Sequence, residues 1–249
     1  MVEMTFNSTV IDREDIHRDL AVIKIQPDEG TVPEFQAGQF CTLGLPADAA
    51  PHPETEAAKA ALDEAGAETK TAAQTQKKVK FIRRAYSIAS SPKQREFLEL
   101  YVVLVGEGKL TPRLWTVEQG GRLFLDPRIK GEFTLENIPQ GKNLIMIATG
   151  TGLAPFISMM RTFRGTGFWN NCVIIHGVRY ATDFGYREEL EAAAAEDPSI
   201  HYIPMASGED DGSEWHGLRG RVQVALEPSR FEKITGFPLE AETCEVFLC

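Results

Sequence analysis

The chain has 249 residues, which is enough for one large domain or two of ordinary size. Apolar residues make up 43 % and charged residues 25 %, which excludes a wholly disordered, collagen-like or coiled-coil chain. The 36 acidic residues outnumber the 26 basic ones, so the net charge of −10 has the wrong sign for a general nucleic-acid binder. An anionic partner must therefore meet a local basic patch.

Residues 1 to about 138 are predicted to form mainly strands. Short β-branched or aromatic runs, each bounded by Gly, Pro or Asp, occupy residues 21–27, 39–46, 85–92, 97–105 and 122–127. Their spacing indicates an antiparallel barrel or sandwich.

Residues 47–78 form an insertion that does not fit this pattern. The insertion contains no aromatic residue, and Leu62 is its only large aliphatic side chain, so it cannot supply a core. The run at 54–66 has high helix propensity, which predicts a short surface helix on a mobile insertion. Two interpretations remain open, a solvated insertion and a partner-binding element.

From residue 144 the pattern changes to alternating strands and helices. Strands are predicted at 144–149, 173–178, 201–206 and 245–249, and helices near 153–164 and 186–196. This alternation predicts a parallel sheet with βαβ crossovers. The polar segment 137–143 contains Pro and Gly and is the predicted domain boundary.

The four cysteines favour a reducing, cytoplasmic compartment, because none is in a C-x-x-C pair and a chain of this size needs no disulfides. Cys244 and Cys249 have the C-x4-C spacing that opens a plant-type iron–sulfur pattern, but the further ligands are missing and no metal is expected.

The first residues contain no signal segment. Gly-Thr-Gly and Pro155 interrupt the most apolar stretch, 144–160, so no membrane span is expected.

Arg84, Ala85, Tyr86 and Ser87 form the first candidate site. The arginine fork suits a pyrophosphate. Tyr86 faces the same side of a strand as Arg84, so its ring could stack on a flat heterocycle while its hydroxyl stays in water. Ser87 adds a small hydrogen-bonding group beside the ring. An ordinary strand with a surface arginine and a half-buried tyrosine would show the same spacing.

Residues 106–112 form a glycine-rich loop after the strand that ends at 105. Its free backbone N–H groups and the Thr111 hydroxyl could hold a phosphate. The same residues also suit a plain turn that Thr111 caps, with Pro112 at the start of a short helix.

Gly150, Thr151 and Gly152 lie between a predicted strand and a predicted helix, at the βα turn where open α/β sheets bind ligands. The glycines allow a pyrophosphate to approach the backbone, and the helix N-terminus favours its charge. Pro155 stands where the third glycine of G-x-G-x-x-G would be. The strand–turn–helix context nevertheless favours nucleotide binding.

Arg179 ends the next predicted strand, where a NAD site would carry an acid, and Arg187 follows nearby. Arginines here suit a 2′-phosphate and favour NADP over NAD. Arg187 could instead pair with Glu191 one helical turn away, and Asp183 would oppose an anion.

Cys249 ends the last strand at the sheet edge where a ligand would lie, although a buried structural cysteine is the alternative.

The motifs RAYSIASSP, GKLTPRL, GTGLAPF, VIIHGVRY and the final FLC stand in an order that resembles the bacterial-type ferredoxin–NADP reductases. The resemblance covers nearly the whole chain outside 47–78. It implies a β + α/β fold, with an FAD-binding antiparallel β-barrel over 1–139 and a Rossmann-like, NADP-binding parallel α/β domain over 140–249. It also implies a flavoprotein oxidoreductase that transfers hydride between NADP(H) and FAD, and single electrons to or from ferredoxin or flavodoxin.

The same resemblance implies roles for single residues. Arg84 would hold the FAD pyrophosphate, Tyr86 would stack on the isoalloxazine, and Ser87 would lie near its N5. Lys109, Leu110 and Thr111 would line the FAD phosphates, and Gly150, Thr151 and Gly152 would receive the NADP pyrophosphate. Arg179 and Arg187 would take the 2′-phosphate. Cys249 would approach the nicotinamide, so the predicted catalytic residues are Tyr86, Ser87 and Cys249.

The family normally continues past its FLC motif, so the chain resembles a C-terminally truncated member whose nicotinamide pocket would lack one wall. A chain of net charge −10 should repel an acidic carrier. We therefore expect ferredoxin or flavodoxin to dock on the basic cluster that flanks the flavin motif, Lys77, Lys78, Lys80, Arg83, Lys93 and Arg95. Two alternatives remain open: an NAD(P)H-dependent flavin reductase or oxygenase reductase component, and an FAD electron-relay subunit that uses no nicotinamide.

Overall fold

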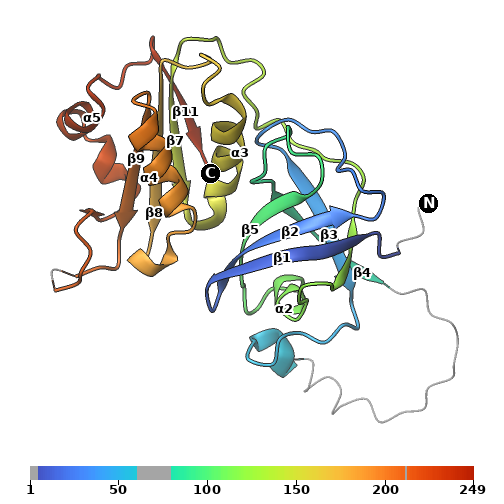
Figure 1. The fold of residues 1–249 in the computed structure, drawn as a ribbon. Coiled ribbons are helices and arrows are strands. Elements are labelled where there is room, and N and C mark those ends of the chain that lie inside the picture. The colour runs from blue at the N-terminus through green and yellow to red at the C-terminus, as the bar shows by residue number, and fades with distance from the viewer. Residues whose placement is uncertain (1–4, 61–79, 211) are drawn as a thin grey trace, which may run out of the picture.

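The computed structural model describes residues 5–60, 80–210 and 212–249, which form two sheets standing side by side (Figure 1). The first sheet has the strand order β4-β3-β6-β1-β2-β5. Its strands are β1 (Ser8–His17), β2 (Leu20–Pro27), β3 (Phe40–Pro46), β4 (Phe81–Ser87), β5 (Leu98–Val103) and β6 (Arg122–Leu125). The pairings between them are antiparallel.

The two edges of this sheet meet. Just past β4, Ile88 pairs with Leu100 of β5, and the N–H of Ala89 donates to the carbonyl of Glu99 at 2.7 Å. The contact closes the sheet around an apolar interior, as the sequence predicted for a barrel. A short helix, α2 (Thr111–Leu114), with Pro112 in its first turn, follows β5.

β1 is a strand that the sequence analysis missed, because the charged run 12–15 hides any alternation of apolar and polar residues. The strand forms through backbone pairing with β2 and β6. Its charges find partners across the sheet. Lys24 of β2 donates to Asp12 at 2.8 Å, and this hydrogen bond lowers the pKa of the Asp12 carboxyl.

The second sheet is parallel, with the strand order β10-β9-β8-β7-β11. Its strands are β7 (Asn143–Thr149), β8 (Asn171–Val178), β9 (Ile200–Ala206), β10 (Leu218–Arg219) and β11 (Cys244–Leu248). Alternate residues of β7 enter different cores, with Met146 on one face and Ile145 on the other. A strand buried on both faces is apolar throughout, which explains its continuous hydrophobic run.

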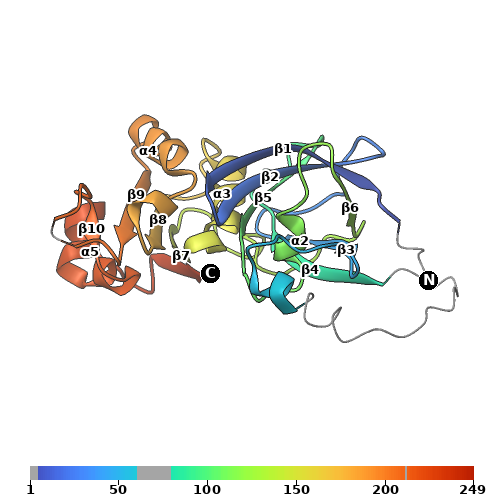
Figure 2. The ribbon, with the colours of Figure 1, turned by 90° about the horizontal axis from the view of Figure 1, so that it is seen from below.

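Helices cover both faces of this sheet (Figure 2). One face packs against α3 (Ala154–Phe163) and α4 (Arg187–Glu196), and the other against η3 (Val222–Leu226) and α5 (Pro228–Thr235). The two-domain β + α/β fold is thus confirmed, although β10, η3 and α5 were not predicted. The predicted boundary at 137–143 lies in the segment that joins β6 to β7.

The order of the parallel strands reverses beside β7. The chain runs outward from β7 through β8 and β9 to β10, and then returns to place β11 on the other side of β7. Open α/β sheets bind ligands outside the carboxyl ends of the strands at such a reversal. In both ribbon views β11 ends at the junction with the barrel, so this binding position faces the first domain (Figures 1 and 2).

The insertion that follows β3 is described only as far as residue 60 and from residue 80. Residues 56–60 are helical, and the remainder of the predicted helix, 61–66, lies outside the described residues. Within the ranges that the structure describes, no helix has the length and apolar composition needed to span a membrane. None of the four cysteines forms a disulfide.

Helix α3 joins the two domains through buried polar contacts. The hydroxyl of Ser158 donates to the carbonyl of Ser90 in the barrel at 2.7 Å. Arg161 donates from Nη1 to Glu99 of β5 at 2.6 Å and from Nε to Glu189 of α4 at 2.7 Å. Burial disfavours the charge of Arg161, but Glu189 and Glu99 outweigh this effect and raise the pKa of the guanidinium. Arg161 therefore holds a barrel strand and two helices together.

Replacing Arg161 with Met should lower the free energy of unfolding by about 3 kcal/mol, because the substitution leaves the buried Glu99 carboxylate without its cation. Arg164→Met is the matched control, since Arg164 pairs with Glu196 at 2.8 Å on the surface and should cost less than about 1 kcal/mol. Urea denaturation followed by tryptophan fluorescence measures both variants. Equal losses would contradict the role given to Arg161.

Candidate functional site

A tight turn at the end of β7 is the centre of the candidate site. β7 runs into the 3-10 turn η1 (Gly150–Leu153), and α3 follows directly. Gly150 has a φ of 52°, a left-handed conformation that favours glycine. A Cβ on Gly152 would lie 2.6 Å from the carbonyl carbon of Cys249, so only glycine fits against the end of β11. The turn thus presents the backbone at the N-terminus of a buried helix, where N–H groups lack intrahelical acceptors.

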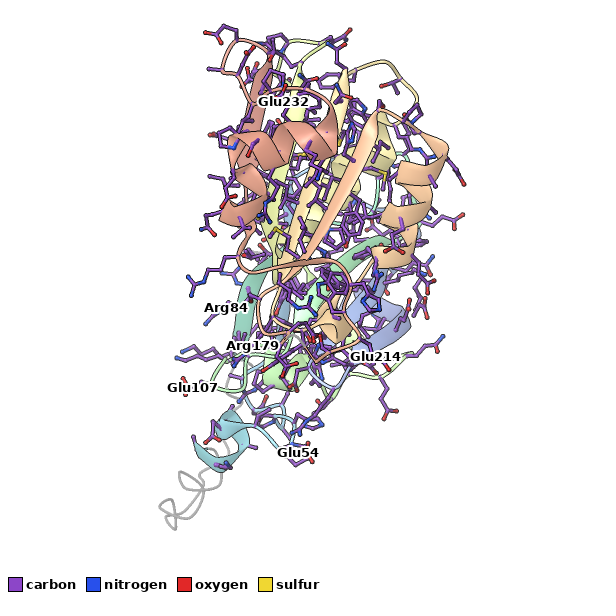
Figure 3. The ribbon with its side chains drawn as sticks, turned by 90° about the vertical axis from the view of Figure 1, so that its left-hand side faces the viewer. Glu54, Arg84, Glu107, Arg179, Glu214 and Glu232 are labelled. Atoms are coloured by element: carbon purple, nitrogen blue, oxygen red, sulfur yellow. The ribbon has the colours of Figure 1, made fainter. Side chains whose placement is uncertain are left out.

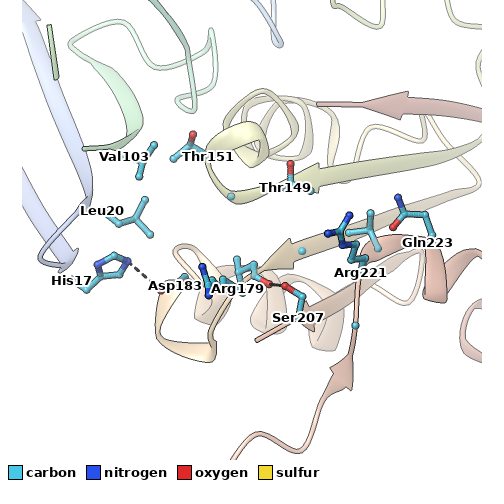
Figure 4. Close-up of a pocket in the computed structure, with 15 residues that line it drawn as sticks. His17, Leu20, Val103, Thr149, Thr151, Arg179, Asp183, Ser207, Arg221 and Gln223 are labelled. Carbon is cyan, nitrogen blue, oxygen red and sulfur yellow. Dashed lines mark hydrogen bonds and ion pairs between the residues drawn. The ribbon is translucent and has the colours of Figure 1, made fainter. Parts of the chain in front are cut away.

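Beside this turn is a cavity of about 520 Å³, which we call the turn cavity (Figure 4). Its walls are Thr149, Gly150, Thr151, Gly177, Val178, Arg179, Asp183, Ser207, Gly220, Arg221, Val222 and Gln223 from the α/β domain, and His17, Leu20 and Val103 from the barrel. Arg179 and Arg221 are the cations of its wall. A dinucleotide could therefore place a pyrophosphate at the turn and a further phosphate near the arginines.

The ion pairs distinguish the arginines of this region. Arg187, predicted to share the site with Arg179, does not line the turn cavity. Its Nε donates to Glu191 at 2.7 Å, and its guanidinium lies 5.1 Å from the ring centre of Trp215. Among the described residues, neither Arg179 nor Arg221 forms an ion pair with a carboxylate. An unpaired arginine is the better phosphate ligand because no existing ion pair must first be broken.

Asp183 lines the turn cavity, where its carboxylate would oppose a nearby anion as the sequence indicated, and its two oxygens are held in place by separate contacts. Oδ2 accepts a hydrogen bond from the N–H of Tyr180 at 2.9 Å, and Oδ1 lies 3.3 Å from Nε2 of His17 in the barrel. Figure 4 shows this contact at the barrel end of the cavity. The carbonyl of Asp183 also accepts a hydrogen bond from the hydroxyl of Tyr101 at 3.2 Å. Both contacts bind the barrel to the wall of the turn cavity.

His176 contributes no charge to this region, although it belongs to β8 and is fully buried. Burial lowers the pKa of its imidazole to about 4, against a smaller opposite effect of the neighbouring Gly150 backbone. The ring is therefore neutral at physiological pH. Its Nδ1 lies 3.3 Å from the Tyr202 hydroxyl.

A second cavity, of about 290 Å³, lies between the barrel and the turn, and we call it the barrel cavity. It is lined by Ala85, Tyr86 and Ser87 of β4, by Tyr101, Val102 and Val103 of β5, by Val105 and Thr111, and by Thr151 and Gly152. Val103 and Thr151 line both cavities. A flat ring in the barrel cavity would therefore lie next to a nucleotide in the turn cavity.

Tyr86 occupies a more enclosed position than its sequence suggested. We expected its hydroxyl to stay in water, but the oxygen is buried and has no hydrogen-bond partner among the described residues. Burial raises the pKa of the phenol, Cys41 adds to this effect, and Arg84 opposes it. A buried hydroxyl without a partner costs about 1–3 kcal/mol, which a ligand group in the cavity would offset. The position of Tyr86 thus fits a bound heterocycle.

The glycine-rich loop between β5 and α2 combines the two interpretations that its sequence left open. The hydroxyl of Thr111 accepts the N–H of Val105 at 3.0 Å and donates to the carbonyl of Val105 at 3.2 Å, so it caps the turn. Yet Thr111 also lines the barrel cavity. Within the described part of the chain, the N–H groups of Glu107, Lys109, Leu110 and Thr111 have no acceptor. The side chain of Leu110 lies in the barrel core, so Leu110 can offer only its backbone.

The remaining predicted residues lie at the edges of the two cavities. Arg84 is exposed on β4, where its Nη1 donates to the carbonyl of Arg83 at 2.8 Å. Cys249 continues the pairing of β11 with β7, since its N–H donates to the carbonyl of Ile147 at 3.0 Å. Its thiol lies 3.5 Å from the position of a Cβ on Gly152, and partial burial raises the pKa of the thiol.

The basic cluster is only partly described. Lys80, Arg83, Lys93 and Arg95 are exposed, whereas Lys77 and Lys78 lie outside the described residues. Lys93 donates to the carbonyl of Thr162 in α3 at 2.7 Å, so it also joins the two domains.

Sequence reasoning missed Arg221, Ser207 and the barrel wall of the turn cavity. Ser207 directly follows β9, which is a position that the rule of carboxyl-end ligands could have identified. Arg221 follows the two-residue strand β10, and no sequence pattern marked a strand so short. His17 and Leu20 reach the cavity from the β1–β2 hairpin, and only the packing of the two domains brings them there.

Comparison with known proteins places the chain among nucleotide-binding oxidoreductases. The family model described as an oxidoreductase NAD-binding domain matches residues 146–249. A flavodoxin/ferredoxin–NADP reductase of Escherichia coli (strain K12) is 32 % identical over 171 residues, which cover 68 % of this chain and 66 % of that protein. The chain thus spans just under two thirds of this relative. An enzyme of the same name from Rhodobacter capsulatus is 34 % identical over 68 % of this chain and 63 % of that protein.

Solved structures agree in fold. A ferredoxin NADP+ reductase from Neisseria gonorrhoeae with bound FAD and NADP superposes with a TM-score of 0.76 at 24 % identity, over 100 % of this chain and 86 % of that one. A ferredoxin–NADP+ reductase from Plasmodium falciparum with 2′P-AMP gives a TM-score of 0.69 at 19 % identity, over 98 % and 85 %. A flavodoxin/ferredoxin–NADP reductase of Buchnera aphidicola (subsp. Baizongia pistaciae) is 33 % identical over 67 % of its own length. With this coverage, and with both cavities in place, the chain belongs to the family of bacterial flavodoxin/ferredoxin–NADP reductases.

Proposed function

We propose that the chain is a cytoplasmic flavoprotein that transfers hydride between NADP(H) and FAD, and single electrons to or from ferredoxin or flavodoxin. The observation that carries the proposal is the junction of the two cavities at Val103 and Thr151. Ligands bound in the two cavities would both contact these residues, and this would bring the ligands into the proximity that hydride transfer requires. The names of the relatives supply the ligands, since these proteins are called flavodoxin/ferredoxin–NADP reductases.

The residues of the barrel cavity fit FAD. The ring of Tyr86 offers a flat apolar face, and its unpartnered hydroxyl calls for a ligand group. Ser87 provides a hydroxyl beside it, where it would reach the edge of the isoalloxazine. The exposed fork of Arg84 and the free N–H groups of Lys109 and Thr111 suit the pyrophosphate. Bound FAD would supply the exchange between two-electron and one-electron transfer.

The turn cavity fits NADP. The backbone of Gly150, Thr151 and Gly152 would receive the pyrophosphate, and the two unpaired arginines, Arg179 and Arg221, would hold the 2′-phosphate. Cys249 lies against Gly152, a residue of the barrel cavity wall, and would border the nicotinamide. Neighbouring apolar groups, Leu20 and Val103, would exclude water from the space between the two rings.

The first test is the visible spectrum of the purified chain after reconstitution with FAD. We expect a flavin spectrum that NADPH bleaches under anaerobic conditions at least about tenfold faster than NADH, because the arginines bind the 2′-phosphate. A chain that binds no flavin would refute the proposal. A bound flavin that neither nucleotide reduces would contradict the hydride step and favour an electron-relay subunit.

Arg179→Gln and Arg221→Gln should each raise the KM for NADPH roughly tenfold and leave the KM for NADH unchanged, because each removes a charged hydrogen bond to the 2′-phosphate. Steady-state kinetics with both nucleotides measure the effect. Arg187→Gln is the matched control, and its ion pair with Glu191 predicts less than about a twofold change. A tenfold rise in this control would restore the original prediction for Arg187.

The carrier should dock on the exposed basic residues beside β4. The double variant Lys80→Glu/Arg83→Glu should slow reduction of ferredoxin or flavodoxin and remove most of its dependence on ionic strength, because steering by opposite charges is lost. Arg230→Glu/Lys233→Glu changes the net charge equally on α5, which lies far from the barrel (Figure 1). The proposed docking surface is wrong if stopped-flow measurements show the same change in the rate of carrier reduction, and in its dependence on ionic strength, for both double variants.

A further inference from the structure

The first part of the insertion, residues 47–60, lies against the glycine-rich loop, and the proposed function gives it no role. We call residues 47–60 the strap, and the glycine-rich loop, residues 106–112, is called the loop. The strap leaves β3 and turns back toward α2 (Figure 1). Figure 3 shows Glu54 of the strap and Glu107 of the loop at the same end of the molecule, opposite Glu232 of α5.

Two backbone hydrogen bonds join the strap to this region. The N–H of Ala57 donates to the carbonyl of Gly106 at 3.1 Å, and the N–H of His52 donates to the carbonyl of Pro112 at 2.7 Å. The strap is itself ordered at this point by Thr55, which is buried. The hydroxyl of Thr55 donates to the carbonyl of His52 at 2.6 Å and accepts the N–H of Ala58 at 3.3 Å.

Arg113 of α2 links the strap and the loop through its side chain. Its Nη2 donates to the carbonyl of Ala47 in the strap at 3.0 Å, and its Nη1 donates to the carbonyl of Lys109 in the loop at 2.8 Å. The Nε atom of Arg113 is buried. A planar fork that is bonded at both ends fixes the separation of its two acceptors.

These contacts determine which way the peptide groups of the loop face. The carbonyls of Gly106 and Lys109 point to the strap and to Arg113, because each accepts a hydrogen bond there. The N–H of a trans peptide points opposite to its carbonyl, so the N–H groups of Glu107 and Leu110 are turned away from these donors. Among the described residues both N–H groups lack an acceptor. The loop therefore keeps its donors free for an anion.

Thr111 and the bond from the N–H of Gly108 to the carbonyl of Val105 at 2.8 Å order the base of the loop, whereas Gly106 gives the backbone beside the strap wide conformational freedom. A Cβ atom at Gly106 would meet nothing within 4 Å, so packing around this glycine does not restrict its backbone conformation. If a loop becomes ordered only when an anion binds, the entropy lost on ordering weakens the binding. A loop already ordered by the strap avoids that loss.

We propose that the strap and Arg113 are positioning elements that hold the loop open for the pyrophosphate of FAD. The inference rests on the proposed function, because it takes FAD as the ligand of the barrel cavity. The strap is then an element for retaining the cofactor, acting on the phosphate end of FAD and leaving its ring to Tyr86.

Arg113→Met tests the proposal, because it keeps the aliphatic stem and removes both bonds of the fork. The apoprotein is titrated with FAD and, separately, with riboflavin, which has the same ring and no phosphate, and flavin fluorescence reports binding. We expect the dissociation constant of FAD to rise roughly tenfold and that of riboflavin to stay within twofold. Arg113→Lys, which offers one ammonium in place of the fork, should recover only part of the FAD affinity.

Arg18→Met is the matched control. Arg18 contacts Glu54 of the strap at 2.9 Å, and within the described ranges it forms no hydrogen bond or ion pair with the loop, so FAD and riboflavin should both bind as in the parent chain. Equal weakening of FAD and riboflavin by Arg113→Met would overturn the proposal, because it would show a general loss of structure. Unchanged FAD affinity would overturn it too. A parent chain that binds neither flavin would refute the proposed function itself.

Discussion

The Arg161 guanidinium fixes the relation between the two domains, and the candidate site depends on that relation. Neither cavity belongs to one domain, since barrel residues line the turn cavity and turn residues line the barrel cavity. Arg161 binds Glu99 of the barrel and Glu189 of α4 at once. Tyr186 donates to the same Glu99 oxygen at 2.9 Å, and it does so with a left-handed φ of 60°. A non-glycine residue keeps such a conformation only where its surroundings hold it.

The same helix that carries Arg161 begins at the glycine turn. Arg161 lies near the end of α3 (Ala154–Phe163), so its distance along the helix from the turn is about 10 Å and is fixed by the helix geometry. Ser158, in the middle of the helix, adds its bond to the barrel. The turn is thereby held against the barrel from one side, while Cys249 at the end of β11 packs on Gly152 from the other. Small displacements of α3 would separate the two cavities.

The sequence was informative where local chemistry decides the structure. The Gly150–Gly152 turn, the strand with Tyr86 and the apolar strands of the parallel sheet have patterns that only a few conformations satisfy. β1 was not predicted because its charged run, 12–15, hides any alternation, and the partner of Asp12, Lys24, lies on a neighbouring strand. Arg221 was not predicted as a site residue because a strand of only two residues sets its position. The burial of the Tyr86 hydroxyl likewise depends on residues distant in sequence, which come together only when the barrel meets the turn.

The distribution of ion pairs explains how a chain of net charge −10 can offer sites for anions. Several arginines at the surface are engaged with carboxylates, as Arg164 is with Glu196 and Arg187 with Glu191. Arg179 and Arg221 line a cavity and have no such partner among the residues that the structure describes. The field inside a narrow cavity depends on the nearest charges, because more distant ones are screened within about 10 Å at ordinary salt. Arg179 and Arg221, the arginines of the turn cavity, therefore favour an anionic ligand there, and the acidic remainder governs only encounters at longer range.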